Sequence, residues 1–217
     1  LLCEPDYGTA AVALMTVLGM LFLGGMRWWY FAALFAVVAV ALVLLVLFSP
    51  YRLARLSSFM HPWSQPYTSG YQLIQSLIAL GRGGFWGVGL GNSIQKLFYL
   101  PEAHTDFMFA ILTEEMGFLG ALSVIALYVM LVARMFWVAC KAQQQGMLFH
   151  AFVAYGIALW LALQAAINIG VNIGLMPTKG ITLPLMSYGG SSLLLSAAAV
   201  AVVLRIAHEV HYGMVHH

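Results

Sequence analysis

Apolar residues occur along the chain in long blocks that short polar links separate. A helix needs about 20 mostly apolar residues to cross the hydrocarbon core of a bilayer. The pattern predicts five membrane-spanning helices, at 8–25, 28–49, 107–140, 149–174 and 184–206. Trp28 and Trp137 lie near the ends of these stretches, where amphipathic rings favour the membrane interface.

The composition agrees with this pattern. Of the 217 residues, 63% are hydrophobic and 7% are charged, and the mean hydropathy is +0.92. Because a soluble surface has about a quarter of its residues charged, this excludes a soluble enzyme, a nucleic-acid binder and a disordered tail. We expect an all-α polytopic membrane protein with a single membrane domain over 1–217. Since the chain begins with Leu1, we also expect it to be the C-terminal part of a longer protein.

Basic residues indicate how the predicted helices are oriented, because cytoplasmic loops carry an excess of Lys and Arg. The short links and the tail on one face contain Arg27, Arg134, Lys141 and Arg205. The short link on the other face contains Lys179. We therefore expect the first face to be cytoplasmic. The long segment on the second face has four further basic residues, but the rule is weak for long loops.

The segment 51–106 is too polar to span the membrane and too apolar for an ordinary loop in water. Its part 71–80 predicts an amphipathic surface helix, with apolar residues on one side (Leu73, Ile74, Leu77, Ile78) and polar residues on the other (Gln72, Gln75, Ser76). The run 81–91 that follows contains six glycines in eleven residues. Because glycine lets a backbone approach a ligand closely, we expect this long extracytoplasmic loop to be functional.

Acidic residues gather at the boundaries of the predicted helices. The most polar boundary is PEAHTDF at 101–107, where His104 and Asp106 can reach a polar substrate at the membrane surface. Asp106 has two interpretations, a catalytic carboxylate or a cap for the following helix. Glu114 and Glu115 lie inside that helix, and we expect them to pair with polar groups of other helices.

Two further patterns favour structural roles. Asn168 and Asn172 share a face of the fourth predicted helix and are expected to make interhelical hydrogen bonds. His208, His211, His216 and His217 could bind a metal, but a solvated tail fits them better. The sequence shows no Ser-His-Asp order typical of a nucleophilic triad. It shows no Cys/His metal cluster either, so we assign no metal ligands.

Several motifs resemble those of the SEDS family of membrane proteins. They are PEAHTDF at 101–107, EEMGFLG at 114–120, PTKG at 177–180 and LPLMSYGGSS at 183–192. The resemblance covers nearly the whole chain and is strongest to the division-specific branch of the family. It implies a protein with about ten spans, of which this chain is the last half. It also implies that the long loop and the PTKG link are extracytoplasmic.

The resemblance implies a peptidoglycan glycosyltransferase that polymerises lipid II into β-1,4-linked glycan strands and releases undecaprenyl diphosphate. The family's catalytic aspartate matches Asp106, which would be the general base. The family's PTKG lysine matches Lys179, a candidate to stabilise the diphosphate. The other substrate-binding candidates on this face are Arg82, Lys96, His104 and Ser187. A divalent cation, Mg²⁺ or Mn²⁺, could share the role of the basic residues.

The resemblance also implies partners and a location. The partners are lipid II, a class B penicillin-binding transpeptidase and other divisome proteins, and no nucleic acid. The location is the bacterial inner membrane at the division septum, with the active site on the extracytoplasmic face. A lipid II flippase and a non-catalytic scaffold stay open as alternatives. Transporters have their polar sites near the middle of the membrane, whereas this sequence concentrates ionisable groups at one face, which favours surface chemistry.

Overall fold

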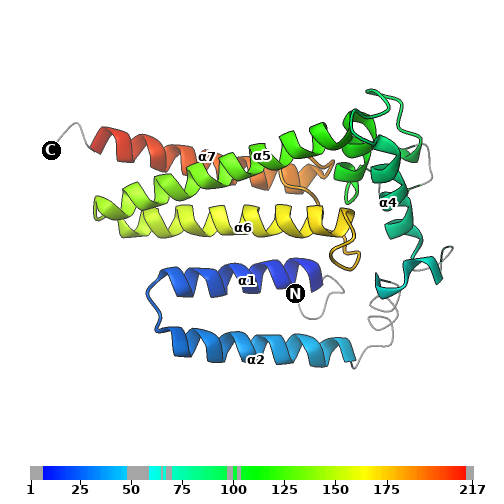
Figure 1. The fold of residues 1–217 in the computed structure, drawn as a ribbon. Helices are drawn as coiled ribbons and strands as arrows, with labels where there is room; N and C mark the ends of the chain where they lie inside the picture. The colour runs from blue at the N-terminus through cyan, green and yellow to red at the C-terminus, as the bar shows by residue number, and fades with distance from the viewer. Residues whose placement is uncertain are drawn as a thin grey trace.

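The computed structural model describes residues 7–47, 59–64, 66, 70–96, 100–101 and 104–213, and this part of the chain is helical without strands. The elements are α1 (Tyr7–Leu23), α2 (Trp28–Leu47), η1 (Pro62–Ser64), α4 (Tyr71–Gly83), α5 (Met108–Gln144), α6 (Leu148–Asn172) and α7 (Gly190–Gly213) (Figure 1). The predicted all-α class is confirmed.

Among the described residues, three helices, α5, α6 and α7, are long and apolar enough to cross a membrane. Shorter apolar stretches occupy α1 and α2. The predicted division into five spans stays a prediction, and one predicted boundary is displaced. The last long helix begins at Gly190 and continues to Gly213, whereas the sequence predicted 184–206. The chain turns before α7 because Leu185 has a φ of +63° and the Ser187 hydroxyl accepts the Leu183 N–H at 2.8 Å.

The long helices pack through small side chains. Ala139 and Ala142 of α5 and Ala154 and Ala158 of α6 are fully buried in one cluster, to which α7 contributes Val203. Small residues let helix backbones approach closely, which is how membrane helices associate without a hydrophobic driving force. In Figure 1, α1 lies along α6, and α2 lies on the far side of α1.

The two ends of this bundle differ in structure. We call the end with α4, the start of α5 and the link 173–189 the loop end. We call the other end, with the α1–α2 turn, the α5–α6 turn and the C-terminus of α7, the turn end (Figure 1). The long segment and the PTKG link therefore meet at one end, while the turn end has short connections such as 145–147.

The amphipathic helix α4 crosses the loop end of the bundle (Figure 1). The predicted helix is present, but its buried face differs from the predicted one. Ser76 is fully buried and donates its hydroxyl hydrogen to the Asn172 carbonyl at 2.7 Å, while Ile78 is exposed. A carbonyl in the last turn of a helix lacks an intrahelical partner, and Ser76 supplies one to α6.

The helix α5 is interrupted at Gly117, which has a φ of +69° and a ψ of −166°. The interruption frees backbone groups that the glycine-rich segment satisfies. Val88 N–H donates to the Glu114 carbonyl at 3.0 Å, and Phe118 N–H donates to the Gly84 carbonyl at 2.9 Å. The glycines therefore let the loop approach α5, whereas the sequence suggested that they approach a ligand.

Candidate functional site

Asp106 lies at the loop end, just before α5, and its side chain is half-buried. Its Oδ2 is so close to Gly180 that a Cβ on Gly180 would come within 3.3 Å of it. Gly180 is the last residue of the PTKG link, so the fold brings together two motifs that are distant in the sequence. The N-cap position of α5 is occupied by Phe107 rather than Asp106.

Two asparagines near the end of α6 fix the backbone at Asp106. The Nδ2 atoms of Asn168 and Asn172 donate to the Asp106 carbonyl at 2.8 and 3.0 Å. The Oδ1 of Asn172 accepts the Ala110 N–H at 3.0 Å, a donor in the first turn of α5 that is shared with the Phe107 carbonyl. Both asparagines are buried. The interhelical hydrogen bonds expected from the sequence are therefore present, and they act on the candidate catalytic residue.

The link between α6 and α7 is held by side chains of α6. Asn168 Nδ2 donates to the Ile181 carbonyl at 2.6 Å, and Gln164 Nε2 donates to the Thr182 carbonyl at 3.0 Å. Lys179 is half-buried, and its carbonyl accepts the Ile181 N–H at 2.9 Å. Because buried backbone groups need partners, these bonds fix the link that contains Lys179. The next residue of this link, Gly180, borders the Asp106 carboxylate.

His104 and Ser187 have different surroundings in the same region. The His104 side chain is exposed, and its carbonyl accepts the Tyr188 N–H at 2.9 Å. Tyr188 itself is 80% exposed. Ser187 is 3% exposed, and its hydroxyl accepts the Leu183 N–H in the turn before α7. The Ser187 hydroxyl thus stabilises a turn that contacts the Asp106 segment.

Arg82 and Lys96 form ion pairs with carboxylates of α5. Nη1 of Arg82 lies 3.4 Å from Oε1 of Glu114, and Nζ of Lys96 lies 2.8 Å from Oε1 of Glu115. Lys96 also donates to the Gly91 carbonyl at 2.6 Å. The structure therefore brings Asp106 next to the PTKG link and the His104 segment, while Arg82 and Lys96 fix the glycine-rich segment to α5.

Glu114 is the principal residue whose role the sequence left open. Its side chain is 0% exposed, and its carboxylate accepts hydrogen bonds from the Ser93 hydroxyl, the Ile94 N–H at 3.2 Å and the Gln95 N–H at 3.3 Å. A buried charge is tolerated only when it is paired and hydrogen-bonded. The partners are a loop and the end of α4 rather than other spanning helices. The sequence signal was a pair of acids, Glu114 and Glu115, inside an apolar helix, but it did not identify these partners.

The last feature raised by the sequence is a site for a divalent cation. Within the part of the chain that the structure describes, no three His, Cys, Asp or Glu side chains gather as a metal-ligand group. These residues therefore offer no ligand set for the Mg²⁺ or Mn²⁺ considered from the sequence. Glu4, Asp6 and Glu102 lie outside the described residues.

These features define a class of protein, an α-helical multi-pass membrane protein that fixes a half-buried carboxylate at one end of its bundle. The sequence pattern of the FtsW/RodA/SpoVE family of cell cycle proteins matches residues 1–212, and the chain belongs to this family. This confirms the resemblance to the SEDS family.

Similar proteins include two that are each named a probable peptidoglycan glycosyltransferase FtsW. The chain is 58% identical to the one from Coxiella burnetii, over 96% of the chain and 56% of that protein. It is 55% identical to the one from Nitrosococcus halophilus, over 99% of the chain and 56% of that protein. The chain thus spans about half the length of the curated relatives that it matches.

Two solved structures share the fold. One comes from work on the structural coordination of polymerization and crosslinking by a peptidoglycan synthase complex, with a TM-score of 0.71, 33% identity and coverage of 96% of this chain and 57% of that chain. The other is a mutant of the rod shape determining protein RodA of Thermus thermophilus, with a TM-score of 0.59, 29% identity and coverage of 95% and 51%.

Proposed function

We propose that the full-length protein is a peptidoglycan glycosyltransferase that polymerises lipid II during septal cell-wall synthesis, with Asp106 as the general base. The observation that carries this proposal is the half-buried Asp106 carboxylate, which lies against Gly180 of the PTKG link at the loop end. The names of the FtsW relatives support the reaction class.

The reaction needs a base because the 4-hydroxyl of the acceptor sugar attacks the anomeric carbon of the donor sugar. The new C–O bond forms as the bond to the diphosphate oxygen breaks, and the configuration changes from α to β. The hydroxyl proton goes to the Asp106 carboxylate, and undecaprenyl diphosphate leaves as an anion. Asn168 and Asn172 hold the Asp106 backbone, so the carboxylate needs little reorganisation when the acceptor binds.

The leaving diphosphate needs positive charge, and Lys179 is the cation that we assign to it. Its link is fixed by Asn168 and Gln164, and the next residue, Gly180, borders the Asp106 carboxylate. We assign Arg82 and Lys96 an indirect role in catalysis. Their ion pairs with Glu114 and Glu115 hold the loop against α5, so they support the site without contacting the diphosphate. The exposed His104 would contact the sugars, and Ser187 would shape their cavity through its turn.

The proposed partner is a class B penicillin-binding transpeptidase, together with other divisome proteins in the inner membrane. Support comes from the fold neighbour, whose structure belongs to a peptidoglycan synthase complex that links polymerization to crosslinking. The active site would lie on the extracytoplasmic face, because the basic residues from which the orientation was predicted, Arg27, Arg134, Lys141 and Arg205, lie at the turn end.

The test is polymerisation of purified lipid II by the full-length protein with its transpeptidase partner. Asp106→Asn keeps the size of the side chain and removes the base, and we expect the rate to fall by at least about 100-fold. Glu209→Gln is the matched control, because it removes a carboxylate from the turn end, and it should polymerise at the wild-type rate.

Equal glycan output from wild type and Asp106→Asn would contradict the assignment of the base. If wild-type protein in proteoliposomes translocates lipid II without polymerising it, the flippase alternative is correct. If it does neither and still recruits the transpeptidase, the scaffold alternative is correct.

A further inference from the structure

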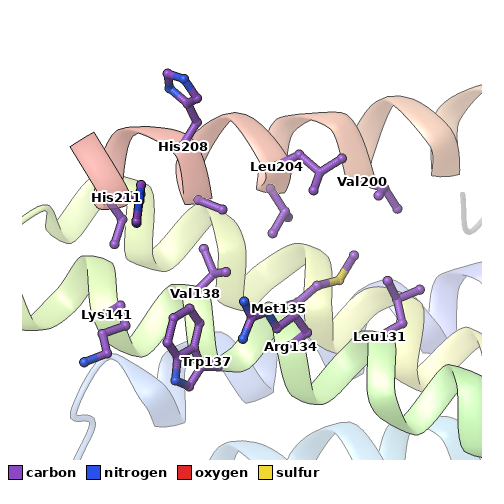
Figure 2. A pocket seen from close by; sticks show the side chains of 13 residues that line it. Leu131, Arg134, Met135, Trp137, Val138, Lys141, Val200, Leu204, His208 and His211 are labelled. Carbon is purple, nitrogen blue, oxygen red and sulfur yellow. The ribbon is translucent and has the colours of Figure 1, made fainter. Parts of the chain in front are cut away.

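A groove of about 390 Å³ lies between α5 and α7 at the turn end, away from Asp106 (Figure 2). The sides of the groove are mostly aliphatic, with Leu131 of α5 and Val200 and Leu204 of α7 among the lining residues. In Figure 2, Leu131 and Val200 lie at one end of the groove and Lys141 and His211 at the other. The groove therefore has an apolar end and a basic end.

The basic end is lined by Arg134 and Lys141 of α5 and by His208 and His211 of α7. The Arg134 guanidinium carbon lies 4.3 Å from the centroid of the Trp137 ring, and the Lys141 Nζ lies 5.8 Å from it. Among the described residues, neither cation forms an ion pair with a carboxylate. Glu209 of α7 pairs with Arg205 and His150 instead. The positive charge in the groove is thus available to a ligand.

The length and polarity of the groove match one molecule of a membrane lipid. From Leu131 to Lys141, α5 rises about 15 Å. A phospholipid could place its phosphate beside Arg134 and Lys141 and one acyl chain along the aliphatic sides. A soluble anion would use the basic end but gain nothing from the apolar end.

The expected orientation of the protein points to the same ligand. The turn end has Arg27 in a short turn and Arg134, Lys141 and Arg205 in the last turns of α5 and α7, and it is therefore expected on the cytoplasmic side. The cytoplasmic leaflet is rich in anionic lipids, and basic pockets between membrane helices on this side bind their headgroups. We infer that the groove between α5 and α7 binds an anionic phospholipid of the cytoplasmic leaflet.

The test measures lipid binding to the full-length protein in detergent by native mass spectrometry. Phosphatidylglycerol is compared with phosphatidylcholine of the same acyl chains. We expect a clear preference for phosphatidylglycerol, and we expect Arg134→Gln and Lys141→Gln each to weaken it about fivefold. Both side chains are at least partly exposed, so these variants should fold.

Arg205→Gln is the matched control, because it removes the same charge at the same end but outside the groove. It should keep the wild-type preference. Equal binding of the two lipids, or the same loss in Arg205→Gln as in Lys141→Gln, would overturn the inference. Competition by glycerol 3-phosphate at the concentration at which the lipid binds would also overturn it, because the site would then be a soluble-anion site.

Discussion

At the loop end, Arg82 and Lys96 each lie within 3.4 Å of a carboxylate of α5, whereas at the turn end Arg134 and Lys141 lie against the Trp137 ring. The loop end also has irregular backbone, with α5 interrupted at Gly117. The turn end joins regular helices by short turns. Arg82 and Lys96 are thus paired within the chain, whereas Arg134 and Lys141 have no carboxylate partner among the described residues.

This difference between the two ends follows from how regular the backbone is at each end. Non-helical segments at membrane depth are tolerated only where protein or a water-filled cavity satisfies their polar groups. The loop end therefore needs Glu114, Asn168 and Asn172 as fixed partners, and the two asparagines also hold the Asp106 segment. The turn end joins regular helices by short turns, and among the described residues its Arg134 and Lys141 have no carboxylate partner. Three pairs of substitutions, one member at each end, test this comparison.

The largest effect on stability is expected from Glu114→Leu. It removes the acceptor of the Ser93 hydroxyl and of two loop N–H groups, and it leaves Arg82 without its partner. Arg82 is partly exposed and can be solvated, so the loss comes mainly from the loop donors left without an acceptor, at about 1–3 kcal/mol each and about 3–5 kcal/mol together. Thermal unfolding of the full-length protein in detergent should report this loss. Glu209→Gln at the turn end should cost less than about 1 kcal/mol, because its ion pairs are exposed. Similar losses for both variants would remove the contrast between the ends.

A somewhat smaller effect is expected from Gly87→Ala. Its φ is +81°, and the new Cβ would come within 2.6 Å of the Glu115 carbonyl carbon. Strain and overlap together should cost about 3 kcal/mol. Gly25→Ala is the control at the turn end, with a φ of +84° and no atom within 4 Å of its Cβ. It should cost only about 1 kcal/mol in the same unfolding assay. If the two variants lose the same free energy of unfolding, the close approach of the loop to α5 contributes nothing to stability.

The smallest effect on stability is expected from Asn172→Ala, but this variant should also slow catalysis. It loses the hydrogen bonds to the Asp106 carbonyl and the Ala110 N–H, at a cost of about 2 kcal/mol. Because Asp106 would be less well fixed, we expect lipid II polymerisation to slow about tenfold.

Gln145→Ala is the control for this substitution. It removes an amide whose Nε2 donates to the Val210 carbonyl at 2.9 Å at the turn end. Its polymerisation rate should stay at the wild-type value. If Gln145→Ala slows the reaction as much as Asn172→Ala does, the asparagine acts through general stability and not through Asp106.

Local pattern was a good guide to helices and a poor guide to their partners. The amphipathic helix at 71–80 is present as α4, but burial of Ser76 and exposure of Ile78 depend on where α6 ends. The displaced start of α7 depends on a turn that Ser187 and Leu183 close. The polarity of Glu114 was visible in the sequence, but its loop partners were not.

Long apolar blocks and contiguous motifs are local features of the chain, so they were enough to predict the all-α membrane class and the family. Three features became visible only in the folded molecule: the Asp106 carboxylate lies against Gly180, two asparagines hold the Asp106 carbonyl, and Arg82 and Lys96 are paired. They were hidden before because these contacts join segments far apart in the chain. Their geometry depends on how whole helices pack and where each one ends.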